Sequence, residues 1–222
     1  MKVGVIGAGA MGSGIAQAFA TTEGYEVCLC DIKEEFAANG KARIVKSFDG
    51  RVAKGKMERS EADKIVSKIS IGLKEICKDC DLIVEAAFES MEVKKTTFKE
   101  LHEICKSDCV FSSNTSSLSI TEIGAGIGRP VIGMHFFNPA PVMKLVEVIS
   151  GINTPREVAE KIITISKEIG KVPVEVNETA GFVVNRILVP MINEAIDLYS
   201  MGVASVEGID NAMKLGANHP MG

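Results

Sequence analysis

A glycine-rich turn between an apolar run and a helical segment constrains this chain more than any other feature. Residues 2–7 are apolar and β-branched, which predicts a buried strand, and residues 7–12 follow with the spacing Gly-x-Gly-x-x-Gly. Residues 11–20 are rich in Ala and other small residues, which favours a helix, and residues 26–31 predict a second strand. Strand, glycine turn, helix and strand form a βαβ unit, whose right-handed crossover implies a parallel sheet.

The glycines of this turn each have a physical role in binding a dinucleotide. Gly7 permits the tight turn, Gly9 lets the backbone approach a pyrophosphate, and Gly12 allows close packing of the helix. Met11 lies inside the same turn, where the N–H groups and the positive dipole end of the helix would face the phosphates. The alternative is a glycine turn in some other α/β protein, which the surrounding strand and helix disfavour.

An acidic residue at the end of the second predicted strand indicates which dinucleotide is bound. Asp31 stands at the spacing expected of the residue that accepts hydrogen bonds from the adenosine ribose hydroxyls. Its carboxylate repels a 2′-phosphate, so we expect NAD rather than NADP as the cofactor. Ile32 cannot bind a 2′-phosphate as an arginine would, although the nearby Lys33 leaves use of NADP open.

Further strand and helix patterns extend this unit into an α/β domain. Strands are predicted over 81–86, 109–113, 130–136, 144–149 and 172–176, and helices over 33–53, 60–70, 93–105 and 154–169. We therefore expect a Rossmann-type, doubly wound sheet over residues 1–180. From residue 181 the pattern is helical only, which predicts the start of an all-helical domain over 181–222. About forty residues are few for an independent core, so this domain is expected to be incomplete or to need a partner surface.

Composition narrows the class of partner. The 25 basic and 29 acidic residues give a net charge of −4, which lacks the basic excess typical of nucleic-acid binding. No run of about 18 apolar residues predicts a membrane span, and glycines interrupt the N-terminal run where a signal peptide would be apolar. We expect a cytoplasmic protein with six cysteine thiols and no metal site, because the Cys-x-x-Cys at 77–80 lacks a second pair.

A histidine and a glutamate in neighbouring predicted strands suggest an acid–base pair. His135 ends an apolar strand, and the carboxyl ends of strands in a parallel sheet line the ligand crevice. Glu147 follows in another apolar run, where a buried carboxylate needs a partner. Such a pair suits removal of a proton from an alcohol. The periodicity leaves equally open a satisfied core histidine and an outward-facing glutamate.

Two further polar positions are candidates for holding a substrate. Residues 113–117, Ser-Asn-Thr-Ser-Ser, end another predicted strand and offer hydroxyl and amide groups to a substrate or to a nicotinamide. Asn185 begins the helical region beyond the domain boundary. Each position has a simpler interpretation, as a strand-to-helix turn with capping hydroxyls and as a polar residue at a helix N-terminus.

Five segments together resemble the 3-hydroxyacyl-CoA dehydrogenases, over essentially the whole chain. They are Gly-Ala-Gly-Ala-Met-Gly-Ser-Gly-Ile-Ala-Gln at 7–17, Ser-Asn-Thr-Ser-Ser-Leu-Ser-Ile-Thr at 113–121, His-Phe-Phe-Asn-Pro-Ala-Pro-Val-Met-Lys-Leu-Val-Glu-Val at 135–148, Gly-Phe-Val-Val-Asn-Arg at 181–186 and Ala-Met-Lys-Leu-Gly-Ala-Asn-His-Pro-Met-Gly at 212–222. The His-Phe-Phe-Asn-Pro segment is highly specific. Within the family, the resemblance is closest to bacterial members that act on 3-hydroxybutyryl-CoA.

The resemblance implies NAD-dependent interconversion of (S)-3-hydroxyacyl-CoA and 3-oxoacyl-CoA with short acyl chains. It implies that His135 is the general base for the 3-hydroxyl and that Glu147 orients it. The other implied ligand contacts are Ser116 and Asn185 at the substrate oxygen, Asn138 and Ser116 on the nicotinamide side, Glu89 and Lys94 near the cofactor, and Ser47 and Lys54 at CoA. For the CoA contacts, a solvated helix face is an equal alternative.

Three features depart from the family pattern. Ala180 stands where the family has Pro, the turn at 128–131 is shorter, and family members continue beyond the Pro-Met-Gly at which this chain stops. The missing part would complete the helical domain, so a second hypothesis is a chain that binds NAD without turnover. A third hypothesis, a β-hydroxyacid dehydrogenase with a lysine base, is disfavoured by the segment around His135 and by Glu147.

One face of the helix predicted around residues 183–198 is apolar. The residues at 3-4 spacing are Ile187, Leu188, Met191, Ile192, Ala195 and Leu198. A face this broad must be buried in the folded protein. We therefore expect it to pack on a second copy of the chain and to form a homodimer.

Overall fold

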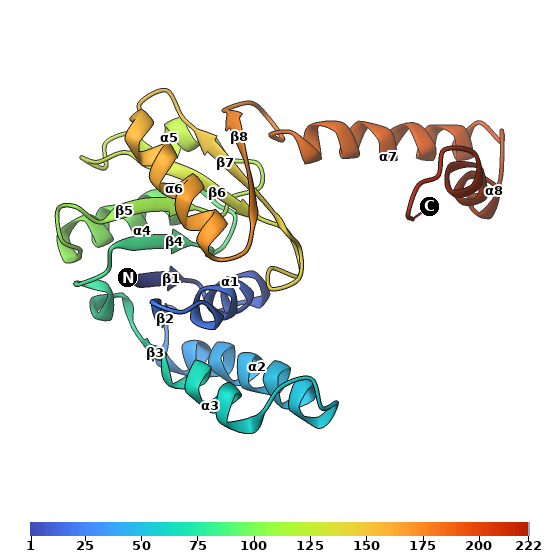
Figure 1. The fold of residues 1–222 in the computed structure, drawn as a ribbon. Helices are drawn as coiled ribbons and strands as arrows, with labels where there is room; N and C mark the ends of the chain where they lie inside the picture. The colour runs from blue at the N-terminus through green and yellow to red at the C-terminus, as the bar shows by residue number, and fades with distance from the viewer. Residues whose placement is uncertain (222) are drawn as a thin grey trace. The chain divides into compact units, whose positions relative to one another are not determined.

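The computed structural model describes residues 1–221 (Figure 1). They divide into two compact units, and the boundary in the sequence falls between Ala180 and Gly181. The first unit contains one eight-stranded sheet. In spatial order its strands are β3 (Ile69–Gly72), β2 (Glu26–Cys30), β1 (Lys2–Ile6), β4 (Leu82–Glu85), β5 (Val110–Ser113), β6 (Val131–Phe136), β7 (Leu145–Ser150) and β8 (Val172–Asn177). Neighbouring strands are parallel throughout, except that β6 and β7 are antiparallel. This order confirms the predicted doubly wound sheet.

The strand order reverses between β1 and β4, and ligands bind at such a reversal in open α/β sheets. In the register of the sheet, Ile6 at the end of β1 lies opposite Glu85 at the end of β4. Glu85 in turn lies opposite Ser113 at the end of β5. The turns that leave these three strands therefore begin side by side, at the carboxyl edge of the sheet.

Helices cover both faces of the sheet. They are α1 (Ala10–Thr21), α2 (Glu34–Ala53), α3 (Arg59–Ser67), α4 (Met91–Ile104), α5 (Ile120–Gly124) and α6 (Arg156–Glu168). Apolar side chains of α1, α2, α3 and α6 join one continuous core, in which the rings of Phe19 and Phe136 meet edge to face at 6.5 Å. On the opposite face, Phe98 of α4 stacks on Phe111 of β5 with ring centroids 5.3 Å apart. Alternate strand residues point to these two cores.

One edge of the sheet differs from the sequence prediction. The pattern predicted a helix over 60–70, whereas α3 ends at Ser67 and β3 begins at Ile69. Only the first and last residues of β3 are buried, so the strand has no continuous apolar run to mark it. Its pairing with β2 defines it, and that is a long-range contact that a local pattern does not report.

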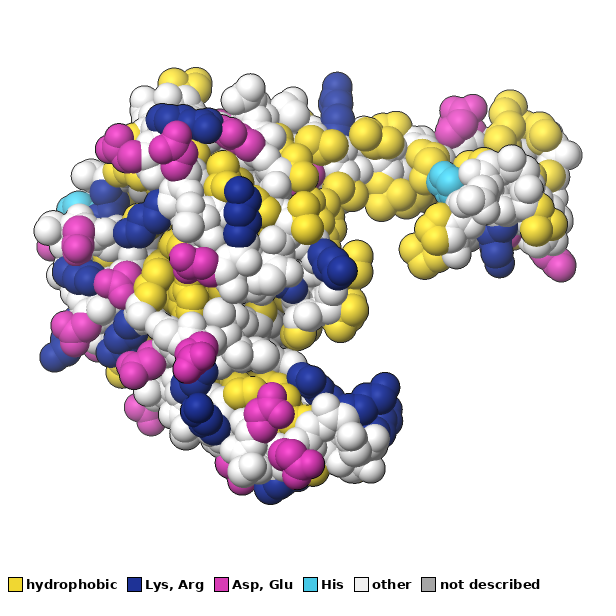
Figure 2. Space-filling view, viewed as in Figure 1, with side chains coloured by type: hydrophobic (Ala, Val, Ile, Leu, Met, Phe, Trp, Pro, Cys, Tyr) yellow, Lys and Arg dark blue, Asp and Glu magenta, His cyan; other side chains and the backbone are white. Residues whose placement is uncertain are grey.

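The second unit is helical in its described residues. It contains α7 (Val184–Ser200), α8 (Val206–Asn211) and a π-helical turn over Ala212–Gly216. The hydroxyl of Ser205 accepts a hydrogen bond from the Gly208 N–H and so caps α8. No residue of α7 is buried, and yellow apolar side chains lie along it in Figure 2. Within residues 1–221, no helix has both the length and the apolar character needed to cross a bilayer.

Candidate active site

The glycine turn after β1 is built from backbone geometry. Gly7 has a φ of +97°, a conformation that residues with a Cβ rarely adopt. A Cβ on Gly12 would lie 1.7 Å from the Gly7 carbonyl oxygen, so only glycine allows α1 to start this close to the strand. A Cβ on Gly9 would meet nothing within 4 Å, so the backbone at the start of α1 is open to a ligand. The turn therefore fits a pyrophosphate at a helix N-terminus.

Asp31 is tied to this turn from the end of β2. One of its carboxylate oxygens, Oδ2, accepts a hydrogen bond of 2.7 Å from the Ala8 N–H, and Oδ1 accepts one of 2.7 Å from the Ile32 N–H. These bonds fix the carboxylate beside the glycine turn. A carboxylate has about four acceptor positions, so Asp31 can also accept hydrogen bonds from two ribose hydroxyls.

Two residues of α2 hold the same turn and were not identified from the sequence. A Cβ on Gly40 would lie 2.7 Å from the Cβ of Ala8, so the glycine lets α2 pack directly on the turn. The Arg43 guanidinium donates a hydrogen bond of 2.9 Å to the Ala8 carbonyl. Gly40 lies between Ala37 and Ile44 on the buried stripe of α2, and that helical spacing is the signal that marks it.

His135 and Glu147 lie directly opposite each other in the antiparallel pair of β6 and β7. His135 Nδ1 and Glu147 Oε2 are 2.7 Å apart, and the exposed fractions of the two side chains are 7% and 1%. The alternative of an outward-facing glutamate is therefore wrong. In the tautomer that carries its proton on Nδ1, the imidazole donates that hydrogen bond to Glu147 and Nε2 is the acceptor nitrogen of the ring.

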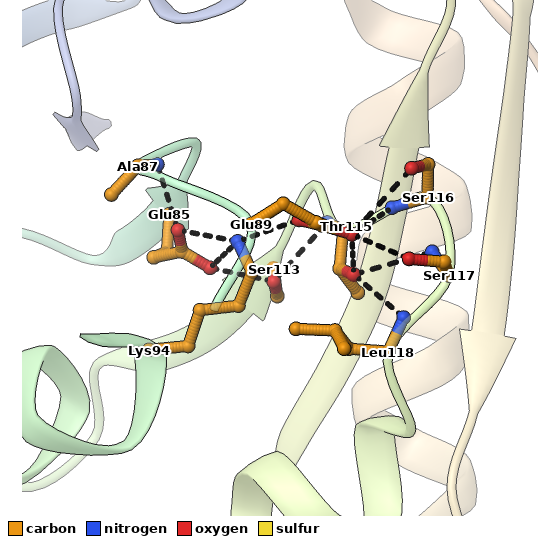
Figure 3. A network of polar contacts seen from close by, with 9 residues as sticks. All are labelled: Glu85, Ala87, Glu89, Lys94, Ser113, Thr115, Ser116, Ser117 and Leu118. Atoms are coloured by element: carbon orange, nitrogen blue, oxygen red, sulfur yellow. Dashed lines mark hydrogen bonds and ion pairs between the residues drawn. The ribbon is translucent and has the colours of Figure 1, made fainter. Parts of the chain in front are cut away.

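A buried polar network joins the ends of β4 and β5 (Figure 3). Glu85 ends β4 with its carboxylate fully buried, and the Lys94 ammonium contacts its two oxygens at 2.9 and 3.0 Å. The Ser113 hydroxyl donates to the same carboxylate at 2.6 Å, and the Ala87 N–H donates to it at 2.7 Å. Lys94 also reaches Glu89, with Nζ and Oε2 3.1 Å apart. One ammonium is thus shared by two carboxylates.

Glu89 organises the polar turn after β5. Its Oε1 accepts hydrogen bonds from the Thr115 hydroxyl at 2.5 Å, the Ser116 N–H at 3.0 Å and the Ser117 hydroxyl at 3.0 Å. Burial alone would raise the pKa of the Glu89 carboxyl, but the Thr115 hydroxyl and the Lys94 charge outweigh it and lower that pKa below its usual range. Glu89 therefore stays ionised beside the turn that carries Ser116.

Asn114 connects this turn to the histidine strand. Its side-chain oxygen accepts a hydrogen bond of 2.8 Å from the N–H of Phe136, the residue after His135. Its own N–H donates to the Glu85 carbonyl at 2.7 Å. The ends of β4, β5 and β6 are therefore linked through one residue, whose amide the sequence analysis had offered to a substrate or a nicotinamide.

Comparison with known proteins gives a match over the whole chain. The family model described as "3-hydroxyacyl-CoA dehydrogenase, NAD binding domain" matches residues 2–179, and the model of the C-terminal domain of the same family matches residues 181–222. The chain belongs to the 3-hydroxyacyl-CoA dehydrogenase family. It is therefore an NAD-dependent oxidoreductase, as the resemblance implied, and the glycine turn and Asp31 supply a fitting site for NAD.

Named relatives within this family are similar in sequence and structure. A 3-hydroxybutyryl-CoA dehydrogenase of Clostridioides difficile is 53% identical, over 100% of this chain and 80% of the relative. A probable 3-hydroxybutyryl-CoA dehydrogenase of Bacillus subtilis is 48% identical, over 100% of this chain and 78% of the relative. The crystal structure of (S)-3-hydroxybutyryl-CoA dehydrogenase from Ralstonia eutropha gives a TM-score of 0.96 at 42% identity, covering 100% of this chain and 79% of that one.

The loop after β6 carries Asn138, another residue that the resemblance to 3-hydroxyacyl-CoA dehydrogenases singled out. Asn138 is exposed in the loop after β6. The Lys171 ammonium anchors that loop by donating to the carbonyls of Ala140 at 2.6 Å and Met143 at 2.8 Å, and burial lowers its pKa. Lys171 is a further residue that the sequence analysis missed, because it follows α6 and reaches the loop only in the folded chain.

The remaining expected contacts lie on helices. Ser47 is exposed on α2, and Lys54 is exposed at its C-terminal end. Asn185 lies in the first turn of α7, in the second unit.

All six cysteines are buried thiols, with the sulfurs of Cys30 and Cys77 3.4 Å apart. In residues 1–221, no group of three or more His, Cys, Asp or Glu side chains is arranged to hold a metal ion.

Proposed function

We propose that this chain interconverts (S)-3-hydroxyacyl-CoA and 3-oxoacyl-CoA, with 3-hydroxybutyryl-CoA and acetoacetyl-CoA as its short-chain pair. The observation that carries the proposal is the buried His135–Glu147 pair at the carboxyl edge of a sheet whose first turn fits a dinucleotide. The names of the relatives from Clostridioides difficile and Ralstonia eutropha support the short-chain substrate.

His135 acts as the general base in this proposal. Glu147 accepts the proton on Nδ1, which fixes the tautomer and leaves Nε2 to remove the proton of the substrate's 3-hydroxyl. As that proton leaves, the imidazole becomes cationic, and the adjacent carboxylate stabilises the charge. NAD, when bound, supplies the acceptor for the hydride from C3. In the reverse direction the same imidazolium returns the proton to the 3-oxo oxygen.

Ser116 and Asn185 hold the substrate oxygen in this proposal. The N–H of Ser116 donates to Glu89 at 3.0 Å, so the backbone of Ser116 is fixed before a substrate arrives. Such preorganisation favours a single orientation of the reacting group. Asn138, in the loop that Lys171 anchors, contacts the nicotinamide side together with Ser116.

The cofactor contacts divide between backbone and side chains. Gly7, Gly9, Met11 and Gly12 present the turn and the N-terminus of α1 to the pyrophosphate, and Asp31 binds the ribose. Glu89, which holds the Ser116 turn, contacts the cofactor in this proposal. Lys94 supports the cofactor site through Glu89, since its side chain is only 1% exposed and its ammonium contacts carboxylates.

Ser47 and Lys54 contact the CoA moiety in this proposal. Ser47 is exposed on α2 and Lys54 is exposed directly after its last residue, and this helix also packs on the glycine turn through Gly40. Lys54 follows Arg51 near the end of the helix, so cationic side chains are available there to a phosphate group.

The proposed homodimer uses the apolar face of α7. Ile187, Met191 and Ile192 of that face are exposed by 65%, 36% and 47%. Burying such side chains against a second copy is favourable by about 25 cal/mol for each Å² of apolar surface removed from water. Sedimentation at micromolar concentration tests this: a dimer that Ile187→Asp converts to monomer is expected, and a monomeric wild type contradicts the dimer.

The decisive experiment is acetoacetyl-CoA-dependent oxidation of NADH, run beside NADPH. We expect turnover with NADH and a loss of about a thousandfold or more in His135→Ala, because the general base is removed. His102→Gln is the matched control, since His102 lies on α4 and contacts Arg129 instead of the paired carboxylate. Turnover that survives in His135→Ala contradicts the proposed base.

Binding of NADH, followed by its fluorescence, separates the proposal from its alternative. Wild-type chain that binds NADH but turns over no acetoacetyl-CoA supports the hypothesis of an NAD-binding fragment. Preference for NADPH in either assay contradicts the role given to Asp31, whose carboxylate repels a 2′-phosphate.

A further inference from the structure

Glu85 is a fully buried carboxylate with a complete set of partners, and none of the proposed chemical steps uses it. Its two oxygens receive two contacts from Lys94, one from the Ser113 hydroxyl and one from the Ala87 N–H. These partners come from α4, from the end of β5 and from the loop after β4. Glu85 therefore ties together the three segments that surround the Ser116 turn (Figure 3).

A path of polar contacts leads from Glu85 to Ser116. Along one branch, Lys94 joins Glu85 to Glu89, and Glu89 accepts the Ser116 N–H. Along the other branch, the Ser113 hydroxyl donates to Glu85 and accepts a hydrogen bond of 3.2 Å from the Thr115 N–H. Both branches end on the turn that carries Ser116.

The energetics of this arrangement favour a role in orientation. The attraction within a buried ion pair little more than offsets the free energy of desolvating its two charges. The pair nevertheless fixes the geometry of the groups that it joins. Here one ammonium is shared by two carboxylates, so the network carries a net negative charge that apolar packing would avoid. A contribution to stability alone therefore does not account for two carboxylates that share one ammonium here.

We propose that Glu85 is a positioning residue of the active site, which holds Glu89 and the Ser116 turn in place through Lys94 and Ser113. The inference rests on the proposed function only in the role given to Ser116. Its structural part, that the Glu85 carboxylate orders the turn at 113–118, stands independently of which substrate is used.

The first test measures the order of the turn without any turnover. Hydrogen exchange of the amides in residues 113–118 is compared between wild type, Glu85→Gln and Glu100→Gln. Glu100 is a matched control, because it is a carboxylate on α4 that pairs with Lys74 at the surface. We expect exchange in the turn to accelerate by about tenfold in Glu85→Gln, because a local opening there becomes easier, and to stay unchanged in the control.

The second test separates positioning from stability. In Glu85→Gln we expect kcat to fall by about tenfold or more, because small misplacements of an orienting group are costly. In the double variant Glu85→Gln/Lys94→Met, no buried ammonium is left short of carboxylates, so the melting temperature recovers toward that of wild type. The turnover number stays low, because Glu89 then lacks the Lys94 ammonium that joined it to residue 85.

Two results would overturn the inference. Unchanged exchange at 113–118 in a folded Glu85→Gln protein means that the carboxylate does not order the turn. Turnover that recovers together with the melting temperature in the double variant means that Glu85 acts through stability alone. Failure of the proposed function looks different: the wild type then shows no acetoacetyl-CoA-dependent turnover, and the exchange result remains interpretable.

Discussion

The glycine turn and the His135–Glu147 pair lie at the same edge of the sheet and are made in opposite ways. The turn presents backbone N–H groups and requires the absence of a side chain, since there is no room for a Cβ at Gly12. The pair presents two side chains and depends on atoms that are present, 2.7 Å apart across two strands. A backbone site is therefore damaged by adding atoms, and a side-chain site by removing a charge or a ring.

Gly12→Ala is expected to have the largest effect of the substitutions that probe this contrast. The new Cβ would lie 1.7 Å from the Gly7 carbonyl oxygen, so α1 must move away from β1. We expect a loss of about 3 kcal/mol or more in the free energy of unfolding and no measurable binding of NADH. Urea denaturation and NADH fluorescence check both.

Gly50→Ala is the control for that substitution. Gly50 lies inside α2, and a Cβ there meets nothing within 4 Å, so alanine is expected to stabilise the helix by about 0.5–1 kcal/mol. If Gly12→Ala behaves like Gly50→Ala, the close contact between α1 and the Gly7 carbonyl does not shape the turn.

Glu147→Gln probes the side-chain site by removing one charge with almost no change in shape. We expect kcat to fall by about a hundredfold, because the imidazolium formed during the reaction loses its stabilising carboxylate, while NADH binds as before. Steady-state kinetics and NADH titration measure this. Glu175→Gln is the control, since Glu175 lies on the adjacent strand β8 and pairs with Arg156 at the surface. Equal losses of kcat in the two variants would contradict the role of Glu147.

Gly9→Ala tests whether the open space at the glycine turn serves a ligand. Gly9 has φ −67° and ψ −166°, which alanine adopts without strain, and a Cβ meets nothing within 4 Å. We therefore expect unchanged stability but a Kd for NADH raised by about tenfold, because the methyl group occupies the approach to the backbone. Unaltered NADH affinity would show that the pyrophosphate does not approach this glycine.

Glu89→Gln has the smallest expected effect and probes a carboxylate that accepts hydrogen bonds both from a backbone N–H and from side-chain hydroxyls. Because the folded-state pKa of Glu89 lies below its ordinary value of 4.5, this residue stabilises the fold above that pH and loses its contribution as the pH falls through the folded-state pKa. Urea denaturation at about pH 6 and about pH 4 should show a larger loss in wild type than in Glu89→Gln. An equal loss in both proteins contradicts the lowered pKa.

Sequence patterns predicted the parts of the site that lie within one local motif. The glycine turn, Asp31 and the strands that carry His135 and Glu147 follow from periodicity and spacing, because each is set by neighbours in the chain. The patterns did not identify Glu85 or Lys171, nor the contact of Asn114 with Phe136, because these partners are brought together only by the folded sheet. They also missed β3, which only its pairing with β2 defines.

The antiparallel pairing of β6 and β7 has a consequence for how this site can diversify. His135 and Glu147 are neighbours through the ladder of the two strands, so the length of the connection between them does not set their distance. A change of length within the exposed residues 141–144 therefore leaves the histidine–glutamate pairing in place. A slip of one residue in the pairing would instead turn Glu147 to the opposite face.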